Sequence, residues 1–331
     1  MRTWKPTGYE KGMVIRMKRS KAQAIPQKGS NKSLWQQIWK NRSVYLMILP
    51  VFLWFLVFSY WPLTWLRMAF YNYKLKKGFS GSEFVGLQNF INFFVKNDAL
   101  KLIWNTLAIN IWALIILFPA PILLALLFSE LRLPRFKKSI QTISYLPHFM
   151  STVMLVSFIN IMLSPSLGLV GRVFTMLGLQ PIYFLGDPKY FRAIQVISGL
   201  WQTVGWNSIV YVAALSGIDP QLYEAARMDG ASRLQQITRV TLPCLIPTII
   251  TMLLIQLGQI LGSNFEKILL MQNDYNMEVS EVIQTFVYKR ALQQGDYGLS
   301  TAAGLFNSVV SLILVIIANK ITKKLTDTSL W

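Results

Sequence analysis

The sequence contains a single cysteine, Cys244, and a single histidine, His148. One cysteine cannot close an internal disulfide, and a zinc site built from His and Cys needs three or four such ligands. The sequence therefore excludes a disulfide framework and a His/Cys metal centre. We expect this chain to bind no metal ion and no cofactor.

Charged residues are also scarce, and they are absent from long stretches. Only 14% of the 331 residues are charged, whereas soluble domains carry about a quarter. Six charge-free stretches reach the roughly 20 residues with which a helix crosses a membrane. These stretches are Ser43–Leu66, Leu102–Ser129, Ser139–Gly171, Ala193–Ile218, Val240–Phe265 and Tyr297–Asn319. The sequence predicts an all-α membrane protein with six transmembrane helices.

None of the six stretches contains Asp or Glu. This disfavours an ion-coupled secondary transporter, which needs an acid or a relay inside the membrane, and a membrane-embedded hydrolase, which needs acids or metal ligands there. The dipeptide Gly-Lys never occurs, so the phosphate-binding loop of P-loop NTPases is missing. We do not expect the chain to be an enzyme.

The first apolar stretch is predicted to be a permanent anchor. Forty-two mostly polar residues precede it, and no small-residue cleavage pattern follows it, unlike in a secretory signal. A shorter charge-free stretch, Val173–Gly186, is interrupted by Pro181. We expect it to be a re-entrant or surface segment.

The net charge of +19 is unevenly distributed between the loops. Both tails and the segments Glu130–Lys138 and Asp219–Arg239 together hold 21 of the 33 basic residues and six acids, whereas the alternate segments hold ten basic and seven acidic residues. Basic residues concentrate on the cytoplasmic side of membrane proteins. We therefore expect both termini in the cytoplasm of a protein of the cell membrane, and no nucleic acid as partner.

This reading divides the chain into three parts. Residues 1–42 form a basic cytoplasmic tail that fixes topology and touches anionic lipid headgroups or, alternatively, docks a partner. Residues 43–322 form the six-span domain, and residues 323–331 form a cytoplasmic tail. The outer stretch Phe84–Phe94 is predicted to form a short amphipathic helix along the membrane surface.

A polar stretch between the fourth and fifth spans, "YEAARMDGASRLQQITRVTLP" (Tyr223–Pro243), is predicted to form two short helices on the inner face. Asp219 and Pro220 suit an N-cap and a first helical position. Gly230 suits a left-handed stop, and Ser232 with Gln235 suits a capping box. The stretch could dock a protein partner or simply connect two spans along the headgroups.

The same stretch resembles the EAA motif of binding-protein-dependent ABC importer permeases. That motif is Glu-Ala-Ala, three residues, Gly, nine residues, Ile, one residue and Leu-Pro, and the chain departs from it only by Val240 in place of Ile. The stretches Phe84–Phe90 and Tyr145–Leu155 add a resemblance to the oligosaccharide and polysaccharide branch of the family. The resemblance covers roughly residues 43–322.

The resemblance implies a type I permease with a cytoplasmic coupling helix between spans four and five. Its partners would be a second homologous permease subunit, an ATP-binding cassette ATPase dimer that holds ATP and Mg, and an extracellular or periplasmic solute-binding protein. The residues that the motif assigns to ATPase coupling are Glu224, Ala225, Ala226, Asp229, Gly230, Leu242 and Pro243.

Polar residues inside spans usually face the bundle interior, and this gives candidates for the solute path. Gln256, Gln259 and Ser263 fall on one stripe of a helix, with Asn264 nearby, and span four adds Trp201 and Asn207. Amides bond sugar hydroxyls and aromatic rings stack on sugar faces, so a carbohydrate path is one interpretation. Hydrogen bonding between helices is the other.

We therefore expect the transmembrane permease subunit of an ATP-driven importer, which moves an oligosaccharide or polysaccharide fragment by alternating access. The same machinery for another polar solute, such as a glycerol phosphodiester, is the alternative.

Overall fold

The structure, a computed structural model, describes residues 39, 41–259, 261, 262 and 264–326. Nearly all of the predicted basic tail, Ser263 and the last five residues of the predicted C-terminal tail lie outside the described residues. The chain divides into two units, Met1–Pro62 and Leu63–Trp331.

The described part of the first unit is helical. Helix α2, Arg42–Phe55, is followed by a π-helical turn, Leu56–Tyr60. Neither element buries a side chain within the chain, and residues such as Met47, Phe52 and Trp54 are exposed. A helix that is apolar on all sides suits a lipid environment, as the first predicted span requires.

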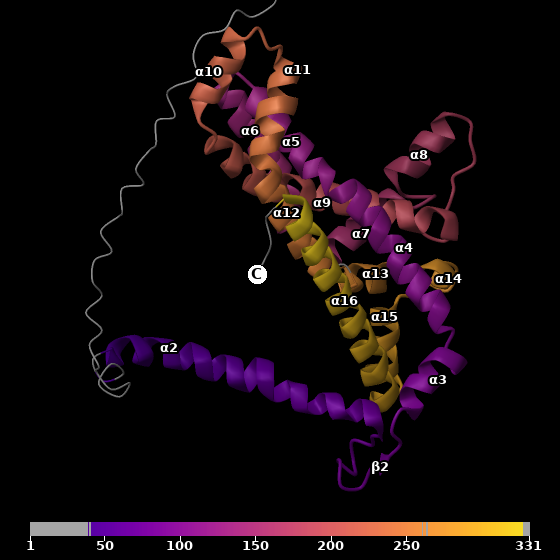
Figure 1. The fold of residues 1–331 in the computed structure, drawn as a ribbon. Coiled ribbons are helices and arrows are strands. Elements are labelled where there is room, and N and C mark those ends of the chain that lie inside the picture. The colour runs from indigo at the N-terminus through magenta and orange to yellow at the C-terminus, as the bar shows by residue number, and fades with distance from the viewer. Residues whose placement is uncertain (1–38, 40, 260, 263, 327–331) are drawn as a thin grey trace, which may run out of the picture. The chain divides into compact units, whose positions relative to one another are not determined.

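The second unit begins with short elements and continues with helices (Figure 1). Its first half contains a 3-10 helix, Trp61–Phe70, which starts just before the unit boundary, β1 Tyr71–Asn72, β2 Glu83–Phe84, α3 Gln88–Lys96, α4 Ala99–Leu117, α5 Pro119–Glu130, α6 Pro134–Tyr145, a 3-10 turn Leu146–Phe149, α7 Thr152–Met162 and α8 Leu169–Met176. β1 and β2 pair antiparallel, with Tyr71 opposite Phe84. Helix α3 is amphipathic, as predicted, and buries Asn89 and Phe93.

The second half of this unit contains its two longest single helices. Its elements are α9 Pro188–Ser216, α10 Pro220–Met228, α11 Arg233–Gln236, a π-helical turn Ile237–Thr241, α12 Leu242–Gly258, α13 Phe265–Met271, α14 Met277–Ser280, α15 Ile283–Tyr288, a π-helical turn Lys289–Gln293 and α16 Tyr297–Thr326.

Four helical stretches among the described residues are long and apolar enough to cross a membrane. They are Arg42–Phe70, Ala99–Glu130, Arg233–Gly258 and Tyr297–Lys323. They correspond to the predicted spans one, two, five and six. The predicted fourth span lies in α9, which has 29 residues, but Gln195, Gln202 and Asn207 make it more polar than the other four.

The third predicted span is not one continuous helix. Helix α6 with its 3-10 turn and helix α7 meet at a bend of 100°. The chain is extended at Met150, and Ser151 starts α7 by accepting a hydrogen bond from the Met154 main-chain N–H. Pro147 cannot donate to a helical ladder, which is consistent with the break. This pair is a bent span or a re-entrant segment.

The fifth predicted span ends early. It was expected to continue to Phe265, but α12 ends at Gly258 and Gln259 is its C-cap. Asn264 then adopts a left-handed conformation, with φ of 66°, before α13 begins. The prediction that Asn264 lies on the same helix as Gln256 is therefore wrong, because α12 ends at Gly258 and Asn264 has a left-handed backbone.

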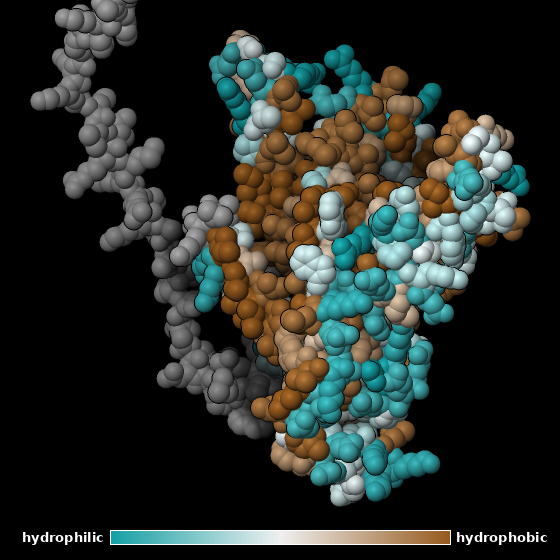
Figure 2. All heavy atoms as spheres, turned by 90° about the vertical axis from the view of Figure 1, so that its right-hand side faces the viewer, coloured by the Kyte–Doolittle hydropathy of each residue, from teal (hydrophilic) through white to brown (hydrophobic). Residues whose placement is uncertain are grey.

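Helix α9 lies at the centre of the second unit, where it packs against α4, α5 and α6. Helix α16 packs against α12, α15 and α3. Figure 1 shows α10 and α11 at one end of this unit and α3 at the other end. Figure 2 shows hydrophilic side chains at the α10/α11 end and a broad hydrophobic area next to it. This alternation fits a unit that crosses a membrane.

A buried asparagine joins three parts of the second unit. Asn105 in α4 is 2% exposed, and its Nδ2 donates to the main-chain oxygens of Glu278 at 2.9 Å and Glu281 at 3.1 Å. Its Oδ1 accepts from Nη2 of Arg192 in α9 at 3.2 Å. Every polar atom of this side chain therefore has a partner.

We expect Asn105→Leu to destabilise the protein by about 3 kcal/mol, because it leaves buried donors and acceptors without partners. The melting temperature in detergent should fall by roughly 6 °C or more. Asn92→Leu is the control, since the Asn92 side chain accepts only one exposed bond, from Gln88. Equal melting temperatures for both variants would contradict the role of Asn105.

Candidate functional site

The local sequence determines the start and end of α10. The Asp219 carboxylate accepts a hydrogen bond from the Gln221 main-chain N–H at 2.9 Å, and Pro220 occupies the first turn. The helix ends at Gly230, whose φ is +75°, a conformation that only glycine adopts at little cost. The Ala231 N–H then donates to the Ala226 carbonyl at 2.9 Å. These features confirm the predicted cap and stop.

The predicted capping box of the second helix is also present. The Gln235 N–H donates to Ser232 Oγ, and the Ser232 N–H donates to Gln235 Oε1 at 2.8 Å. The second helix is not a separate short helix, however. It continues through the π-helical turn into α12 as one stretch, Arg233–Gly258. The π-helical turn lies just before Pro243, which has no N–H for a regular ladder.

Contacts within the hairpin join α10 to the π-helical turn that leads into α12 and fix the neighbouring loop, and the sequence alone did not identify them. The Tyr223 hydroxyl and Thr241 Oγ1 lie 3.1 Å apart, and buried Gln236 donates to the Ala231 carbonyl at 3.0 Å. Leu242 packs against the apolar cluster around Tyr211 and Leu245. Motion of α10 can therefore be passed directly to α12.

The outer face of this hairpin is open. Glu224, Ala225, Asp229 and Gly230 are exposed, and Ala226 is half-buried. Met228 is 88% exposed, and Leu222 and Leu234 are also exposed. Small, charged and apolar side chains on one exposed surface suit a protein partner better than water alone. Among the seven predicted coupling residues, Leu242 is half-buried and Pro243 is exposed.

A cavity of about 330 Å³ lies between α4, α5, α9 and α12. Four of the predicted path residues line it together: Asn207, Gln256, Gln259 and Asn264. The remaining polar lining is Asn110, Thr203 and Tyr211, with apolar residues that include Leu117 and Met252. Amides from three helices, α4, α9 and α12, and from the segment after α12 therefore converge on one space.

Of the other two path candidates, Trp201 lies outside this cavity. Its ring stacks on Phe158, with centroids 5.7 Å apart. Ser263 is outside the described residues. Nearby, the ring of His148 stacks on Trp206 with centroids 4.5 Å apart, which is a packing role.

A second cavity, of about 320 Å³, shares Asn264 with the first. Its lining also includes Thr152, Gln202, Glu266 and Lys267. Because Glu266 and Lys267 are adjacent charges at the end of the fifth predicted span, the sequence predicts that both reach water. Glu266 is exposed, but Lys267 is only 3% exposed, so that expectation is wrong for Lys267.

Lys267 is anchored on the central helix. Its Nζ donates to the main-chain oxygen of Gln195 in α9 at 2.9 Å. Burial lowers the pKa of Lys267 to about 7, because the charged form loses hydration. Within the described part of the chain, no carboxylate forms an ion pair with it.

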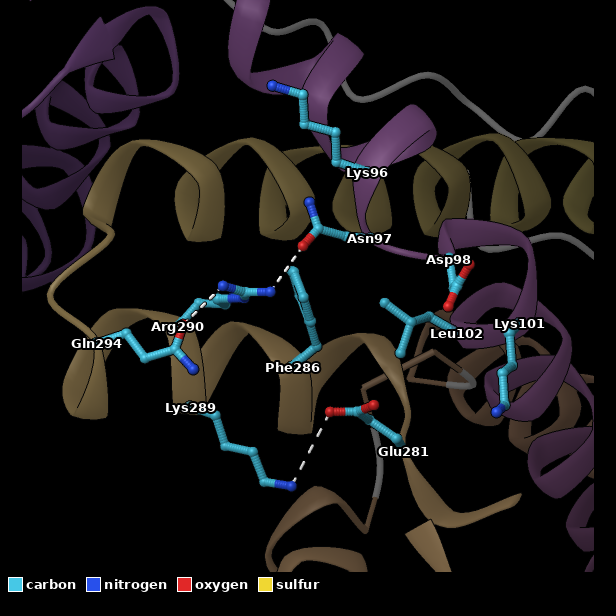
Figure 3. A pocket seen from close by; sticks show the side chains of 10 residues that line it. All are labelled: Lys96, Asn97, Asp98, Lys101, Leu102, Glu281, Phe286, Lys289, Arg290 and Gln294. Carbon is cyan, nitrogen blue, oxygen red and sulfur yellow. Dashed lines mark hydrogen bonds and ion pairs between the residues drawn. The ribbon is translucent and has the colours of Figure 1, made fainter. Parts of the chain in front are cut away.

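A third cavity, of about 280 Å³, lies at the α3 and α15 end (Figure 3). Its basic side chains do not converge. Arg290 donates to Asn97 and to Gln294, both at 2.7 Å, and Lys289 pairs with Glu281 at 4.0 Å. Figure 3 shows Lys96 and Lys101 pointing away from Arg290. These contacts tie the segment before α4 to α15.

The hairpin and the cavities can now be compared with known proteins. The family described as "Binding-protein-dependent transport system inner membrane component" matches residues 118–327. The chain belongs to this family. The resemblance seen in the motif Glu224–Pro243 is thus confirmed, and the protein is a multi-pass membrane component of such a transport system.

Close relatives of this permease come from polysaccharide transport. It is 40% identical over 321 residues to the polygalacturonan/rhamnogalacturonan transport system permease protein YteP of Bacillus subtilis (strain 168), covering 95% of this chain and 100% of the relative. It is 41% identical to a chain of a bacterial ABC transporter involved in the import of the acidic polysaccharide alginate, with a TM-score of 0.84, covering 89% of this chain and 100% of that chain.

The alginate transporter has also been solved in complex with an alginate pentasaccharide-bound periplasmic protein. That chain is 41% identical, with a TM-score of 0.83, and the match covers 90% of this permease and 100% of that chain. This permease therefore shares its fold with a transporter that works with a binding protein.

Proposed function

We propose that this permease is the transmembrane subunit of an ATP-driven importer that translocates an oligosaccharide or polysaccharide fragment. The observation that carries the proposal is the exposed, capped hairpin of α10 and α11 at one end of a helical unit that holds an amide-lined cavity. The relatives named for polygalacturonan and alginate transport support a carbohydrate as the solute.

In this proposal the chain crosses the membrane six times, with the bent pair α6/α7 as the third crossing and α9 as the fourth, in addition to the four apolar helices. Both termini and the α10/α11 hairpin lie in the cytoplasm. The basic residues of the loops support this orientation. The basic N-terminal tail would touch anionic lipid headgroups.

The energy comes from a separate ATP-binding cassette ATPase dimer, which holds ATP and Mg. The coupling surface consists of the motif residues Glu224 to Asp229, the Gly230 turn and the Leu242–Pro243 junction. ATPase closure moves α10, and the contacts between Tyr223 and Thr241 and around Leu242 pass this motion to α12. A second homologous permease completes the path, and a solute-binding protein delivers the sugar from outside.

The solute then meets the cavity between α4, α5, α9 and α12. Alternating access follows when movement of α12 relative to α9 opens the cavity first to one side and then to the other. Amide side chains can donate to and accept from sugar hydroxyls. The cavity is therefore matched to a polar, uncharged surface such as the hydroxyl-bearing face of a sugar.

Reconstitution tests the function. The permease would be placed in proteoliposomes with its partner permease, ATPase and solute-binding protein, and uptake of a labelled oligosaccharide would be measured. We expect uptake that requires ATP and the binding protein and that is insensitive to a proton ionophore. Uptake without ATP would contradict the proposal, and competition only by a glycerol phosphodiester would favour the other solute class.

The cavity amides provide a separate prediction. We expect Gln256→Leu and Asn207→Leu each to lower the apparent affinity for sugar in uptake by about fivefold, because each removes about 1 kcal/mol of hydrogen bonding. Binding of the sugar to the solute-binding protein should stay the same.

Gln180→Leu is the matched control, since Gln180 is exposed and lines neither cavity. An unchanged concentration dependence in both cavity variants would show that this cavity is not the solute path.

A further inference from the structure

Lys267 is a buried lysine that lacks a counter-ion within the described part of the chain. Its side chain is held by one hydrogen bond to a main-chain carbonyl, that of Gln195. An ammonium group has three donors, and a buried charge without an opposite charge costs several kcal/mol. Glu266, the neighbouring acid, is exposed and forms no ion pair with it.

The residue that holds Lys267 also carries an unsatisfied side chain. Gln195 is 5% exposed, and neither Nε2 nor Oε1 of its amide has a hydrogen-bond partner among the residues that the structure describes. The main-chain carbonyl of Gln195 holds Lys267 where α13 meets α9, and two of the three donors of the ammonium are left for a ligand.

This place belongs to the solute path of the proposed function. Lys267 lines the second cavity together with Gln202 and Thr152, and Asn264 lines both this cavity and the larger one. A solute that passes Gln256 and Asn207 and continues past Asn264 reaches the wall that contains Lys267. The positive charge is therefore positioned on the route and not at the lipid surface.

We propose that Lys267, held in place by the main-chain carbonyl of Gln195, binds a carboxylate of the transported saccharide, so that the solute is an acidic sugar such as an oligouronate. A carboxylate carries one negative charge, which one ammonium balances, and it accepts several hydrogen bonds. A phosphate dianion would leave an excess negative charge in the buried site. The solute carboxylate would balance the charge of Lys267 only while the solute passes. Because the bond is transient, it would not hold the solute in the path.

This inference rests on the proposed function, and one pair of solutes separates the two. Uptake of a short oligogalacturonate and of its carboxyl methyl ester would be compared in the full transporter, with the same solute-binding protein in every arm. We expect Lys267→Met to lower uptake of the acid about tenfold relative to wild type and to leave uptake of the ester within twofold. For each protein, the uptake of the acid is divided by the uptake of the ester. Because the binding protein is the same in every arm, a difference in this ratio between variant and wild type arises in the permease.

Lys289→Met is the matched control, because Lys289 already pairs with Glu281 and lines neither of these two cavities. It should leave the acid-to-ester ratio unchanged. An equal loss of acid and ester uptake in Lys267→Met would overturn the inference and leave Lys267 as a tie between α13 and α9. Unchanged acid uptake would overturn it as well.

Two further outcomes separate a failure of this inference from a failure of the proposed function. If wild type takes up neutral oligosaccharides but not the acid, the inference fails and the proposed function stands, whereas the absence of any ATP-driven sugar uptake defeats the proposed function itself. Should Lys267→Met fail to fold, the inference is tested by the melting temperature of the wild-type transporter without binding protein. Oligogalacturonate should raise this melting temperature and the methyl ester should not. Equal effects of the two saccharides would overturn the inference.

Discussion

Replacing Glu224 by lysine is expected to release the ATPase during purification and to abolish ATP-driven uptake. Glu224 is exposed on α10, so reversing its charge should leave the fold intact. At the centre of a docked surface, such a reversal removes a favourable contact and adds a repulsive one, and the loss of a hot-spot residue costs about 2 kcal/mol or more. We therefore expect ATPase co-purification to fall by at least about thirtyfold.

The control is the same charge reversal at the other end of the unit. Glu83 in β2 is also exposed, and β2 belongs to the end where α3 lies (Figure 1). Glu83→Lys should leave ATPase co-purification unchanged. Gly230→Pro provides a second test, because proline fixes φ near −65° whereas Gly230 has φ of +75°. Normal co-purification and uptake in both Glu224→Lys and Gly230→Pro would show that the hairpin is not the docking element.

Gly205→Leu is expected to remove most of the folded protein. Gly205 lies in α9 where α6 crosses it, and a Cβ at this position would overlap the main-chain oxygen and carbon of Ser144. Main-chain atoms of a packed helix cannot move aside as a side-chain end can. We expect a loss above about 4 kcal/mol, seen as aggregation in size-exclusion chromatography of the detergent extract.

Gly304→Ala is the control for this prediction. A Cβ at Gly304 in α16 meets no atom of the described chain within 4 Å, and alanine favours a helix over glycine by about 1 kcal/mol. The control should therefore elute like wild type and melt at the same temperature or a few degrees higher. A monodisperse Gly205→Leu variant with wild-type melting temperature would contradict the close approach of α6 and α9.

Local chemistry made the hairpin predictable. Asp219, Gly230 and the Ser232/Gln235 pair act through hydrogen bonds and backbone conformation within a few residues, so the sequence identified each of them. The apolar stretches could also be predicted from the sequence, because a transmembrane span needs only sufficient length and the absence of charged residues. The candidate residues of the solute path were harder to predict, because they come from different helices. Asn207 and Gln256 share a cavity as expected, whereas Trp201 packs on Phe158.

By itself, the sequence determined that this is a helical membrane protein, where its hairpin begins and ends, and which family it resembles. These properties depend on hydropathy, capping and fixed spacing, which are local. Tertiary structure decided the bend between α6 and α7, the end of α12 at Gly258, the crossing at Gly205 and the burial of Lys267. Each of these depends on contacts between segments far apart in the chain, and no local pattern specifies which segments will meet.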